Sequence, residues 1–182
     1  MRGALPPPTG KTLRILCVGA HPDDPETGCG GTLARYAEAG HDVSVLYMTK
    51  GESEMDGKTP TEVGAMRAAE AEAACRVLGV KPFFFGKQGG LIAVDPATTR
   101  EMIERLDKFA PDVLFGHWPM DVNYDHQVSG MLTIHAFLAK PRRYPLYMFE
   151  VETGTQSLGF APEVYVEIGP VLQKKIEAIR AQ

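Results

Sequence analysis

The chain has 182 residues, 44% of them hydrophobic and 23% charged, with a formal net charge of −4. This length and composition are typical of one globular domain, and the acidic balance argues against a nucleic-acid-binding protein, whose contact surface is usually basic. Because no apolar run approaches the roughly 20 residues of a membrane span, and three cysteines form no CxxC pair, we expect a cytoplasmic protein that does not span a membrane.

Residues 1–12 contain three prolines and are predicted to form a flexible lead-in to a single domain over residues 13–182. In that domain, apolar runs of strand length alternate with segments of helical periodicity. The expected strands are residues 13–20, 43–49, 82–86, 112–117, 144–151 and 163–168, and the expected helices are residues 30–39, 62–78, 97–109, 125–138 and 171–181. This alternation predicts a single-domain, Rossmann-like, three-layer α/β/α fold with a mostly parallel central sheet.

The turn after the first expected strand reads HPDDPE and contains three carboxylates. A dinucleotide-binding protein has GxGxxG directly in this turn, and carboxylates there would repel a pyrophosphate. Nucleotide binding is therefore not expected. His21 and Asp24 are three residues apart and can converge on a divalent cation, whereas the adjacent Asp23 should point differently and can act as a base toward water. A hydrogen-bonded His–Asp turn with solvated acids is the alternative.

A third metal ligand is expected at the same edge of the sheet, since catalytic zinc usually takes three protein ligands. The strand predicted over residues 112–117 continues into GHWPMDVNYDH, where His126 follows Asp125 at the expected start of a helix. Asp125 resembles the N-cap of that helix. Asp121 and Asp125 can orient the imidazoles of metal ligands, as carboxylates commonly do. His117 ends its strand at the same edge and is a candidate for the pocket wall or for support behind the ligands.

Taken together, these motifs resemble those of the LmbE/PIG-L-like zinc-dependent de-N-acetylases over nearly the whole chain from Arg14. The stretch AHPDDPETGCGGTLA (residues 20–34) is similar to the first motif of that family, and MTKGE (residues 48–52) to its Thr-x-Gly-Glu loop. The pair Arg67 and Glu70 matches an Arg-x-x-Glu helix. VYVEIGPVLQKKIEAI (residues 164–179) is similar to the family's C-terminal segment.

The resemblance implies that His21, Asp24 and His126 bind Zn²⁺, with Fe²⁺ or another divalent ion as the alternative metal, and that Asp23 is the general base. Asp125 matches the acid of the family's second motif, which is usually His-Pro-Asp-His. The first histidine of that motif is thought to stabilise an oxyanion or assist the leaving group, and this sequence has Asn123 there. An amide can donate a hydrogen bond but cannot transfer a proton at neutral pH.

The implied activity is metal-dependent removal of an N-acyl group, most often N-acetyl, from an amino sugar or sugar conjugate. Because an asparagine replaces the histidine, a metal-containing carbohydrate-binding or regulatory relative with little hydrolysis is the alternative. A thiol hydrolase using Cys29 is disfavoured, since neighbouring carboxylates would raise the pKa of its thiol. The chain is short for the family, so loops that cover the substrate are either trimmed or supplied by a neighbouring subunit of a homo-oligomer. Candidate residues of the substrate pocket are Glu52, Arg67, His117, Trp118 and Asp121.

Overall fold

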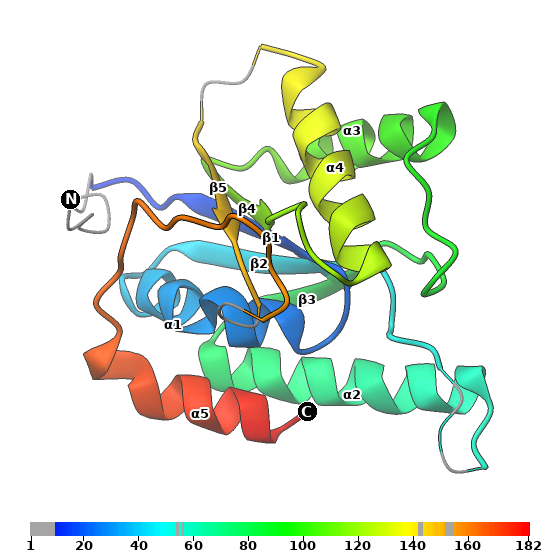
Figure 1. Ribbon diagram of the computed structural model, residues 1–182. Helices are drawn as coiled ribbons and strands as arrows, with labels where there is room; N and C mark the ends of the chain where they lie inside the picture. The colour runs from blue at the N-terminus through cyan, green and yellow to red at the C-terminus, as the bar shows by residue number, and fades with distance from the viewer. Residues whose placement is uncertain (1–9, 54, 56, 142–143, 152–154) are drawn as a thin grey trace.

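The computed structural model describes residues 10–53, 55, 57–141, 144–151 and 155–182. Within these residues, strands alternate with helices along the chain (Figure 1). The strands are β1 (Arg14–Gly19), β2 (Asp42–Tyr47), β3 (Lys81–Phe84), β4 (Val113–His117) and β5 (Leu146–Phe149). The helices are α1 (Asp24–Glu38), α2 (Pro60–Leu78), α3 (Pro96–Phe109), α4 (Tyr124–Leu138) and α5 (Leu172–Arg180), the last preceded by the 3-10 turn η1 (Gly169–Val171). Most of the lead-in predicted at residues 1–12 lies outside the described residues.

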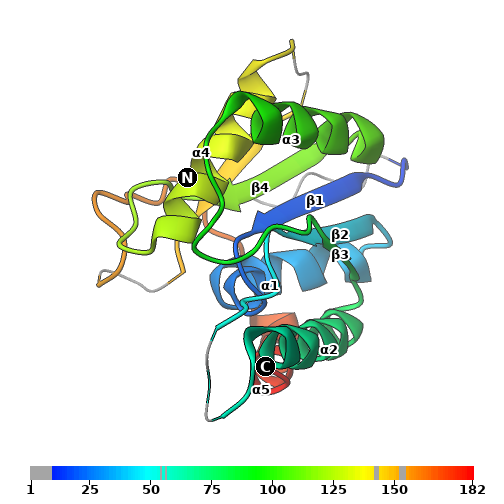
Figure 2. The same ribbon diagram turned by 90° about the vertical axis from the view of Figure 1, so that its right-hand side faces the viewer.

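The strands form one sheet in the order β3-β2-β1-β4-β5, and every neighbouring pair is parallel. Helices α3 and α4 cover one face of the sheet, whereas α1 and α2 cover the other and α5 packs outside them (Figure 2). This arrangement confirms the predicted three-layer α/β fold. From β1 the chain adds β2 and β3 toward one edge of the sheet, and it then returns to add β4 and β5 toward the other edge. The point at which the direction of strand addition reverses, the topological switch point, therefore lies between β1 and β4. In open parallel sheets, ligands bind beyond the carboxyl ends of the strands at this point.

Alternating residues of β1 enter two separate hydrophobic cores. Ile15 and Cys17 belong to the core under α1 and α2, and Leu16 and Val18 to the core under α3 and α4. All four side chains are at most 1% exposed. A strand covered on both faces reads as a continuous apolar run, which is why ILCV contains no polar residue.

Two predicted elements differ from the structure. Helix α1 begins at Asp24 rather than at residue 30, because Asp23 adopts a positive φ of 99° and the acidic turn itself becomes the first helical turn. The strand predicted at residues 163–168 is wrong, since the structure assigns no strand there. Val164 and Tyr165 in this segment are 49% and 61% exposed, so its apolar residues are not those of a strand buried in the sheet.

Glycines of the GCGG stretch serve close packing on one side of α1. A Cβ atom on Gly28 would lie 2.4 Å from the ring of Phe149 in β5, and one on Gly31 would lie 2.7 Å from Cγ2 of Ile168. Any larger residue would push the edge strand or the C-terminal segment away from the helix. These contacts give the glycines a role in packing without any bound phosphate.

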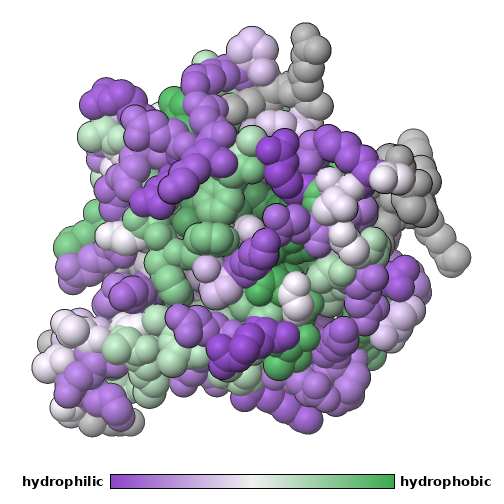
Figure 3. All heavy atoms as spheres, turned by 180° about the vertical axis from the view of Figure 1, so that it is seen from behind, coloured by the Kyte–Doolittle hydropathy of each residue, from purple (hydrophilic) through white to green (hydrophobic). Residues whose placement is uncertain are grey.

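The surface opposite the view of Figure 1 has a group of hydrophobic residues in its middle, surrounded by hydrophilic ones (Figure 3).

The edge strand β3 begins with Lys81 and Pro82, residue types that discourage pairing with another strand. Among the described residues, no helix combines the length and the apolar character needed to cross a membrane.

Candidate metal centre

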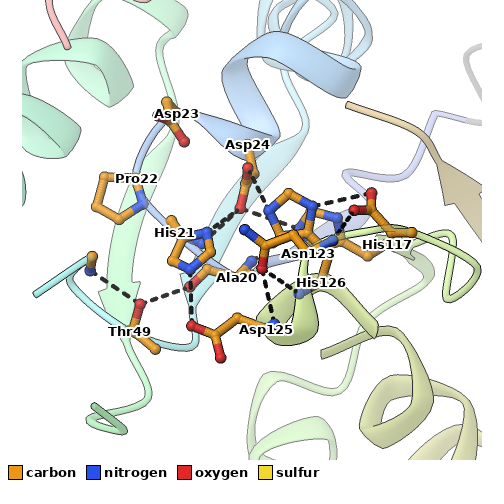
Figure 4. Close-up of polar contacts among 12 residues, drawn as sticks. Ala20, His21, Pro22, Asp23, Asp24, Thr49, His117, Asn123, Asp125 and His126 are labelled. Atoms are coloured by element: carbon orange, nitrogen blue, oxygen red, sulfur yellow. Dashed lines mark hydrogen bonds and ion pairs between the residues drawn. The ribbon is translucent and has the colours of Figure 1, made fainter. Parts of the chain in front are cut away.

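Three side chains from two distant segments meet at the carboxyl ends of β1 and β4. His21 lies in the turn after β1, Asp24 is the first residue of α1, and His126 is in the first turn of α4 (Figure 4). One ligand atom from each residue lies within 4.8 Å of the others. Nδ1 of His21 is 3.1 Å from Oδ2 of Asp24, and Nε2 of His126 is 3.1 Å from Oδ1 of the same aspartate. Two imidazole nitrogens and a carboxylate form a donor set that suits a catalytic divalent cation.

The other nitrogen of each imidazole is held by a second carboxylate. Nε2 of His21 lies 3.0 Å from Oδ2 of Asp125, and Nδ1 of His126 lies 3.1 Å from Oδ2 of Asp121. The backbone N–H of Gly90 in turn donates to both oxygens of Asp125, at 3.0 and 2.9 Å. Each ring is thus fixed between two carboxylates, the arrangement commonly found around histidines that bind metal ions.

The carboxylates create a strongly negative potential at this point. Although burial lowers the pKa of His21, hydrogen bonds to Asp125 and Asp24 raise it to about 9. The pKa of His126 is also raised, since Asp24 and Asp121 outweigh the effect of burial. Burial alone would raise the pKa of Asp24, but hydrogen bonds from the surrounding histidines hold it well below its usual value. A bound divalent cation would satisfy the same potential that otherwise favours protons on the two rings.

Asp23 lies apart from the three ligand candidates, as Figure 4 shows. Its Oδ2 atom accepts a hydrogen bond of 2.8 Å from Nη2 of Arg67, which also donates to the carbonyl oxygen of Pro22 at 2.7 Å. Burial and the neighbouring Asp24 raise the pKa of Asp23 to about 6, and Arg67 acts in the opposite direction. Asp23 is therefore mostly ionised at neutral pH, with a pKa that suits a group exchanging protons.

Glu26, the third acid of the turn, does not face the metal centre. It is fully buried, and the hydroxyl of Tyr47 donates a hydrogen bond to Oε1 of its carboxyl group. Burial raises the pKa of Glu26 to about 7. The three acids of HPDDPE thus have three different surroundings. Their spacing predicted that Asp23 and Asp24 point differently, but it gave no sign that Glu26 is buried.

A cavity of about 570 Å³ opens over the metal centre. Eight residues singled out from the sequence line it, namely His21, Asp23, Asp24, Glu52, Arg67, Asn123, Asp125 and His126. Sequence reasoning missed other residues of the wall, namely Thr27, Gly51, Ser53, Gly89, Gly90, Val151 and Gln156. The volume is within the range of small-molecule sites, about 300–1,000 Å³.

His117 supports the metal centre from behind and does not line this cavity. Its ring is 1% exposed and stacks on His126, with 4.4 Å between the ring centroids. The backbone N–H of Ala20 donates to its Nε2 atom at 2.9 Å, which ties the end of β4 to the end of β1. Burial lowers the pKa of His117, so the ring is neutral. Of the two predicted places for His117, the pocket wall and support behind the ligands, these contacts favour the second, which stays a prediction.

Trp118 and Asp121 also lie outside the wall of the metal cavity. Trp118 lines a second cavity of about 910 Å³ and donates from Nε1 to the carbonyl oxygen of Leu158 at 2.9 Å. Asp121 is behind His126, and its Oδ1 atom accepts from the backbone N–H of Asn123 at 2.8 Å. These contacts hold the loop between β4 and α4 in place, and neither residue is among the described residues that line the metal cavity.

Asn123, and not Asp125, is the N-cap of α4. Its Oδ1 atom accepts from the backbone N–H groups of Asp125 and His126, at 2.9 and 3.4 Å. This contact occupies the amide oxygen and leaves the NH₂ group as a donor on the side of the cavity. The helix start therefore positions an uncharged hydrogen-bond donor beside the ligand candidates.

Gln156 reaches the centre from the C-terminal segment. Its Nε2 atom lies 3.0 Å from Oδ1 of Asp121 and 3.1 Å from Nδ1 of His126. The backbone of this segment pairs with residues 120–122, through bonds such as that from the N–H of Val122 to the carbonyl oxygen of Gln156 at 3.0 Å. An isolated glutamine in a polar stretch gives no sequence signal of this position.

Cys29 is not placed to act as a nucleophile on a ligand in the metal cavity. Its Sγ atom lies 3.5 Å from Sγ of Cys17, on the core side of α1. The residue is 7% exposed and does not line the cavity over the metal centre. The position of Cys29 therefore does not favour a thiol hydrolase.

Comparison with known proteins identifies a family. A family model described as PIG-L: GlcNAc-PI de-N-acetylase matches residues 16–137, which include all three ligand candidates. A diacetylchitobiose deacetylase from Thermococcus kodakarensis is 28% identical over 187 residues, covering 95% of this chain and 70% of the relative.

Two solved structures extend the comparison. A conserved protein from Thermus thermophilus is 30% identical, with a TM-score of 0.77 over 93% of this chain and 78% of that one. The 4-carboxy-2-hydroxymuconate hydratase from Pseudomonas putida is 26% identical, with a TM-score of 0.72 over 93% of this chain and 79% of that one. The matched motifs, the fold and the extent of these alignments confirm the resemblance seen in the sequence, and the chain belongs to the PIG-L family of de-N-acetylases.

Proposed function

We propose that this protein is a zinc-dependent amidohydrolase that removes an N-acetyl group from an amino sugar or sugar conjugate. The observation that carries the proposal is the meeting of two imidazoles, the Asp24 carboxylate and a separate carboxylate, Asp23, in one cavity of a PIG-L family chain. The Thermococcus kodakarensis relative, whose name describes a diacetylchitobiose deacetylase, supports the substrate class.

The residues present fit a divalent cation, because His21, Asp24 and His126 offer converging donor atoms. The imidazole rings of His21 and His126 are also held in place by Asp125 and Asp121. When bound there, such a cation would polarise the acetyl carbonyl and lower the pKa of a water molecule. Catalytic zinc commonly uses this N/O donor set, and three protein ligands leave room for the substrate.

Asp23 carries the proton in the proposed reaction. As a carboxylate, it accepts the proton from the attacking water while a new C–O bond forms at the acetyl carbon. It then returns that proton to the departing nitrogen as the C–N bond breaks, so that acetate and a free amine are released. One carboxylate can perform both steps because it takes up the proton in the first step and gives it up in the second. Asn123 cannot share this role, since its amide does not titrate.

Asn123 acts instead as a hydrogen-bond donor to the oxyanion. Its oxygen is committed to the backbone of α4, and its NH₂ group remains on the cavity side. A donor fixed by a helix cap does not need to reorient when negative charge develops, which is how such groups accelerate acyl transfer. The asparagine thus retains the electrostatic part of the replaced histidine's role, and Asp23 takes over the proton transfer.

The proposal is tested by acetate release from N-acetylglucosamine and N,N′-diacetylchitobiose with the zinc-loaded protein. We expect release by the wild type and at least about a 10³-fold lower rate for Asp23→Ala, with one zinc per chain in both, since Asp23 is not among the ligand candidates. The exposed Glu104→Gln on α3 is the matched control and should behave as wild type. Undiminished turnover by Asp23→Ala would refute the assigned base.

Two other functions are separated by the same assay. A carbohydrate-binding relative would bind zinc and sugar stoichiometrically without releasing acetate. The similarity to the Pseudomonas putida hydratase raises a second reaction class, addition of water to an unsaturated carboxylate. The carboxylate-rich wall of the cavity disfavours such an anionic substrate, and we expect no hydration of 4-carboxy-2-hydroxymuconate.

A further inference from the structure

Carboxylates dominate the charged wall of the metal cavity. Among the described lining residues, Asp23, Asp24, Glu52 and Asp125 are acidic, and Arg67 is the single lysine or arginine; the histidines His21 and His126 are the proposed metal ligands. Asp121 adds another carboxylate directly behind His126. Even with a divalent cation in place, these acids outnumber the positive charges. The cavity is therefore an environment of net negative charge for whatever enters it.

Arg67 is held by acceptors within the protein. Its Nη2 atom is held by Oδ2 of Asp23 and by the carbonyl oxygen of Pro22, at 2.8 and 2.7 Å. Its guanidinium packs against the backbone at Gly51, where an added Cβ would lie only 2.3 Å from Nη1. Turning Nη2 toward an anion would break the contact that positions Asp23, and the Asp23 carboxylate already balances the charge of Arg67.

Lys50 and Lys87 are close in sequence to glycines that line the metal cavity, but their ammonium groups have partners outside it. Lys50 precedes Gly51, but its Nζ atom lies over the ring of Phe84, 5.8 Å from the centroid. Nζ of Lys87 is paired with Glu101 at 2.9 Å. Neither lysine is among the described residues that line the cavity. Binding sites for phosphate usually have several donors directed at the oxygens, from Arg, Lys or backbone N–H groups at a helix N-terminus.

Glu52 is the carboxylate best placed to select substrates by charge. It lines the cavity, lies outside the proposed metal ligands, and has no ion pair within the described structure. Its stem packs against α2, where a Cβ on Gly64 would lie 2.8 Å from Cγ, and the backbone N–H of Lys50 donates to Oε2 at 3.2 Å. These contacts hold the Glu52 carboxylate at the cavity wall, so that its side chain does not swing out toward bulk solvent.

We infer that this cavity selects uncharged or ammonium-bearing N-acetyl amino sugars and discriminates against phosphorylated ones, with Glu52 as a determinant of that selectivity. The inference rests on the proposed deacetylase function. A phosphate dianion beside several carboxylates is repelled strongly wherever water is partly excluded. An ammonium group, including the one that forms when the product amine takes up a proton, is attracted by the same charges.

The first test compares kcat/KM for N-acetylglucosamine with that for its 1-phosphate and its 6-phosphate, using the zinc-loaded protein. We expect each phosphate to be a poorer substrate by at least about ten-fold. Glu52→Gln should reduce this ratio several-fold, whereas Glu72→Gln, on an exposed part of α2, should leave it unchanged. Raising ionic strength from about 0.05 M to about 0.5 M should also reduce the ratio, because salt screens charges. Equal kcat/KM values would overturn the inference.

A binding measurement separates this inference from the proposed reaction. Calorimetric titration of the zinc-loaded protein with glucosamine and with glucosamine 6-phosphate requires no turnover. We expect glucosamine to bind at least about ten-fold more tightly, and Glu52→Gln to narrow the difference. Tighter or equal binding of the phosphate would overturn the inference even if acetate release were observed. A lack of acetate release would refute the proposed reaction, and the binding ratio would still decide the question of charge selectivity.

Discussion

Nη2 of Arg67 lies 2.8 Å from Oδ2 of Asp23, although the two residues are 44 positions apart in the chain. The same nitrogen donates to the carbonyl oxygen of Pro22, so one guanidinium fixes both the backbone and the side chain of the turn after β1. Asp23 has a positive φ of 99°, a conformation that is unfavourable for a residue with a Cβ. Arg67 therefore holds the proposed base in a position that the turn alone would not favour.

Removing this contact should impair catalysis more than metal binding. We expect Arg67→Ala to lower kcat/KM for acetate release by about 10–100-fold while the zinc content stays near one per chain, because a misplaced base loses much of its effect. Arg67→Lys should recover only part of the rate, since an ammonium group cannot reproduce the fixed geometry of a guanidinium. Arg76→Ala, an exposed residue of the same helix, is the control. A variant Arg67→Ala that keeps full activity would show that Arg67 does not position Asp23.

The carboxylates behind the two imidazoles should tune the affinity for the metal. We expect Asp121→Asn and Asp125→Asn each to weaken zinc binding by about 10–100-fold, because each holds the outer nitrogen of one ligand ring. Competition with a chromogenic chelator measures this affinity independently of activity. Glu104→Gln, which is exposed on α3, should leave the affinity unchanged. Wild-type affinity in both aspartate variants would contradict the proposed ligand set.

The two roles of Asn123 can be separated by substitution. Asn123→Asp preserves a capping oxygen and should change the free energy of unfolding by less than about 0.5 kcal/mol, whereas Asn123→Ala should cost about 1 kcal/mol through loss of the helix cap. Both variants lose the NH₂ donor and should lower kcat by about 10²-fold. Denaturant unfolding and acetate release measure the two effects. Full kcat in Asn123→Asp would exclude the amide as an oxyanion donor.

Asp112 makes the stability of the fold depend on pH at the other end of the sheet. Although burial would raise its pKa, the backbone N–H and side chain of Arg14, together with Lys11, lower the pKa of this carboxyl group. A lowered folded-state pKa stabilises the protein above the unfolded value of about 3.9, and the benefit disappears as pH falls through the folded-state pKa.

Asp112→Asn should therefore reduce the free energy of unfolding by about 1 kcal/mol at pH 7, a size typical of hydrogen bonds near the surface. The difference from wild type should shrink steadily in more acidic solution, which denaturant unfolding between neutral and acidic pH would reveal. Glu104→Gln, exposed on α3, is a comparison for simple loss of a surface charge. A difference that grows as pH falls would have the wrong sign for this contact.

The parts of the fold that follow from short-range pattern were predictable from the sequence. The continuous apolar run of β1 marks a strand buried on both faces, and the crowded acids after it indicate a cation site. Rings of His21 and His126 meet because parallel strands end at one edge of the sheet, a rule that requires no coordinates. The same rule made His126 the expected third ligand, and the resemblance to the PIG-L family implies the same residue.

Other features depend on tertiary contacts that have no local signal. The exposed segment at residues 163–168 has the composition of a strand, yet the structure assigns no strand there. His117 has the position of a pocket residue, but its ring is buried by Phe149 and His126, at centroid distances of 4.7 and 4.4 Å. Gln156 reaches the metal centre only because its backbone pairs with the loop before α4. Packing decided each of these outcomes, and packing cannot be read from one short window of sequence.

The central claim is that His21, Asp24 and His126 hold a metal ion that is required for hydrolysis of an N-acetyl amino sugar. Its most direct test is acetate release from N,N′-diacetylchitobiose before chelation, after chelation and after addition of one equivalent of Zn²⁺, with zinc content measured at each stage. We predict that release stops when the metal is removed and returns with about one zinc per chain. Acetate release that persists in the metal-free protein, or no release from protein that holds one zinc per chain, would contradict the claim.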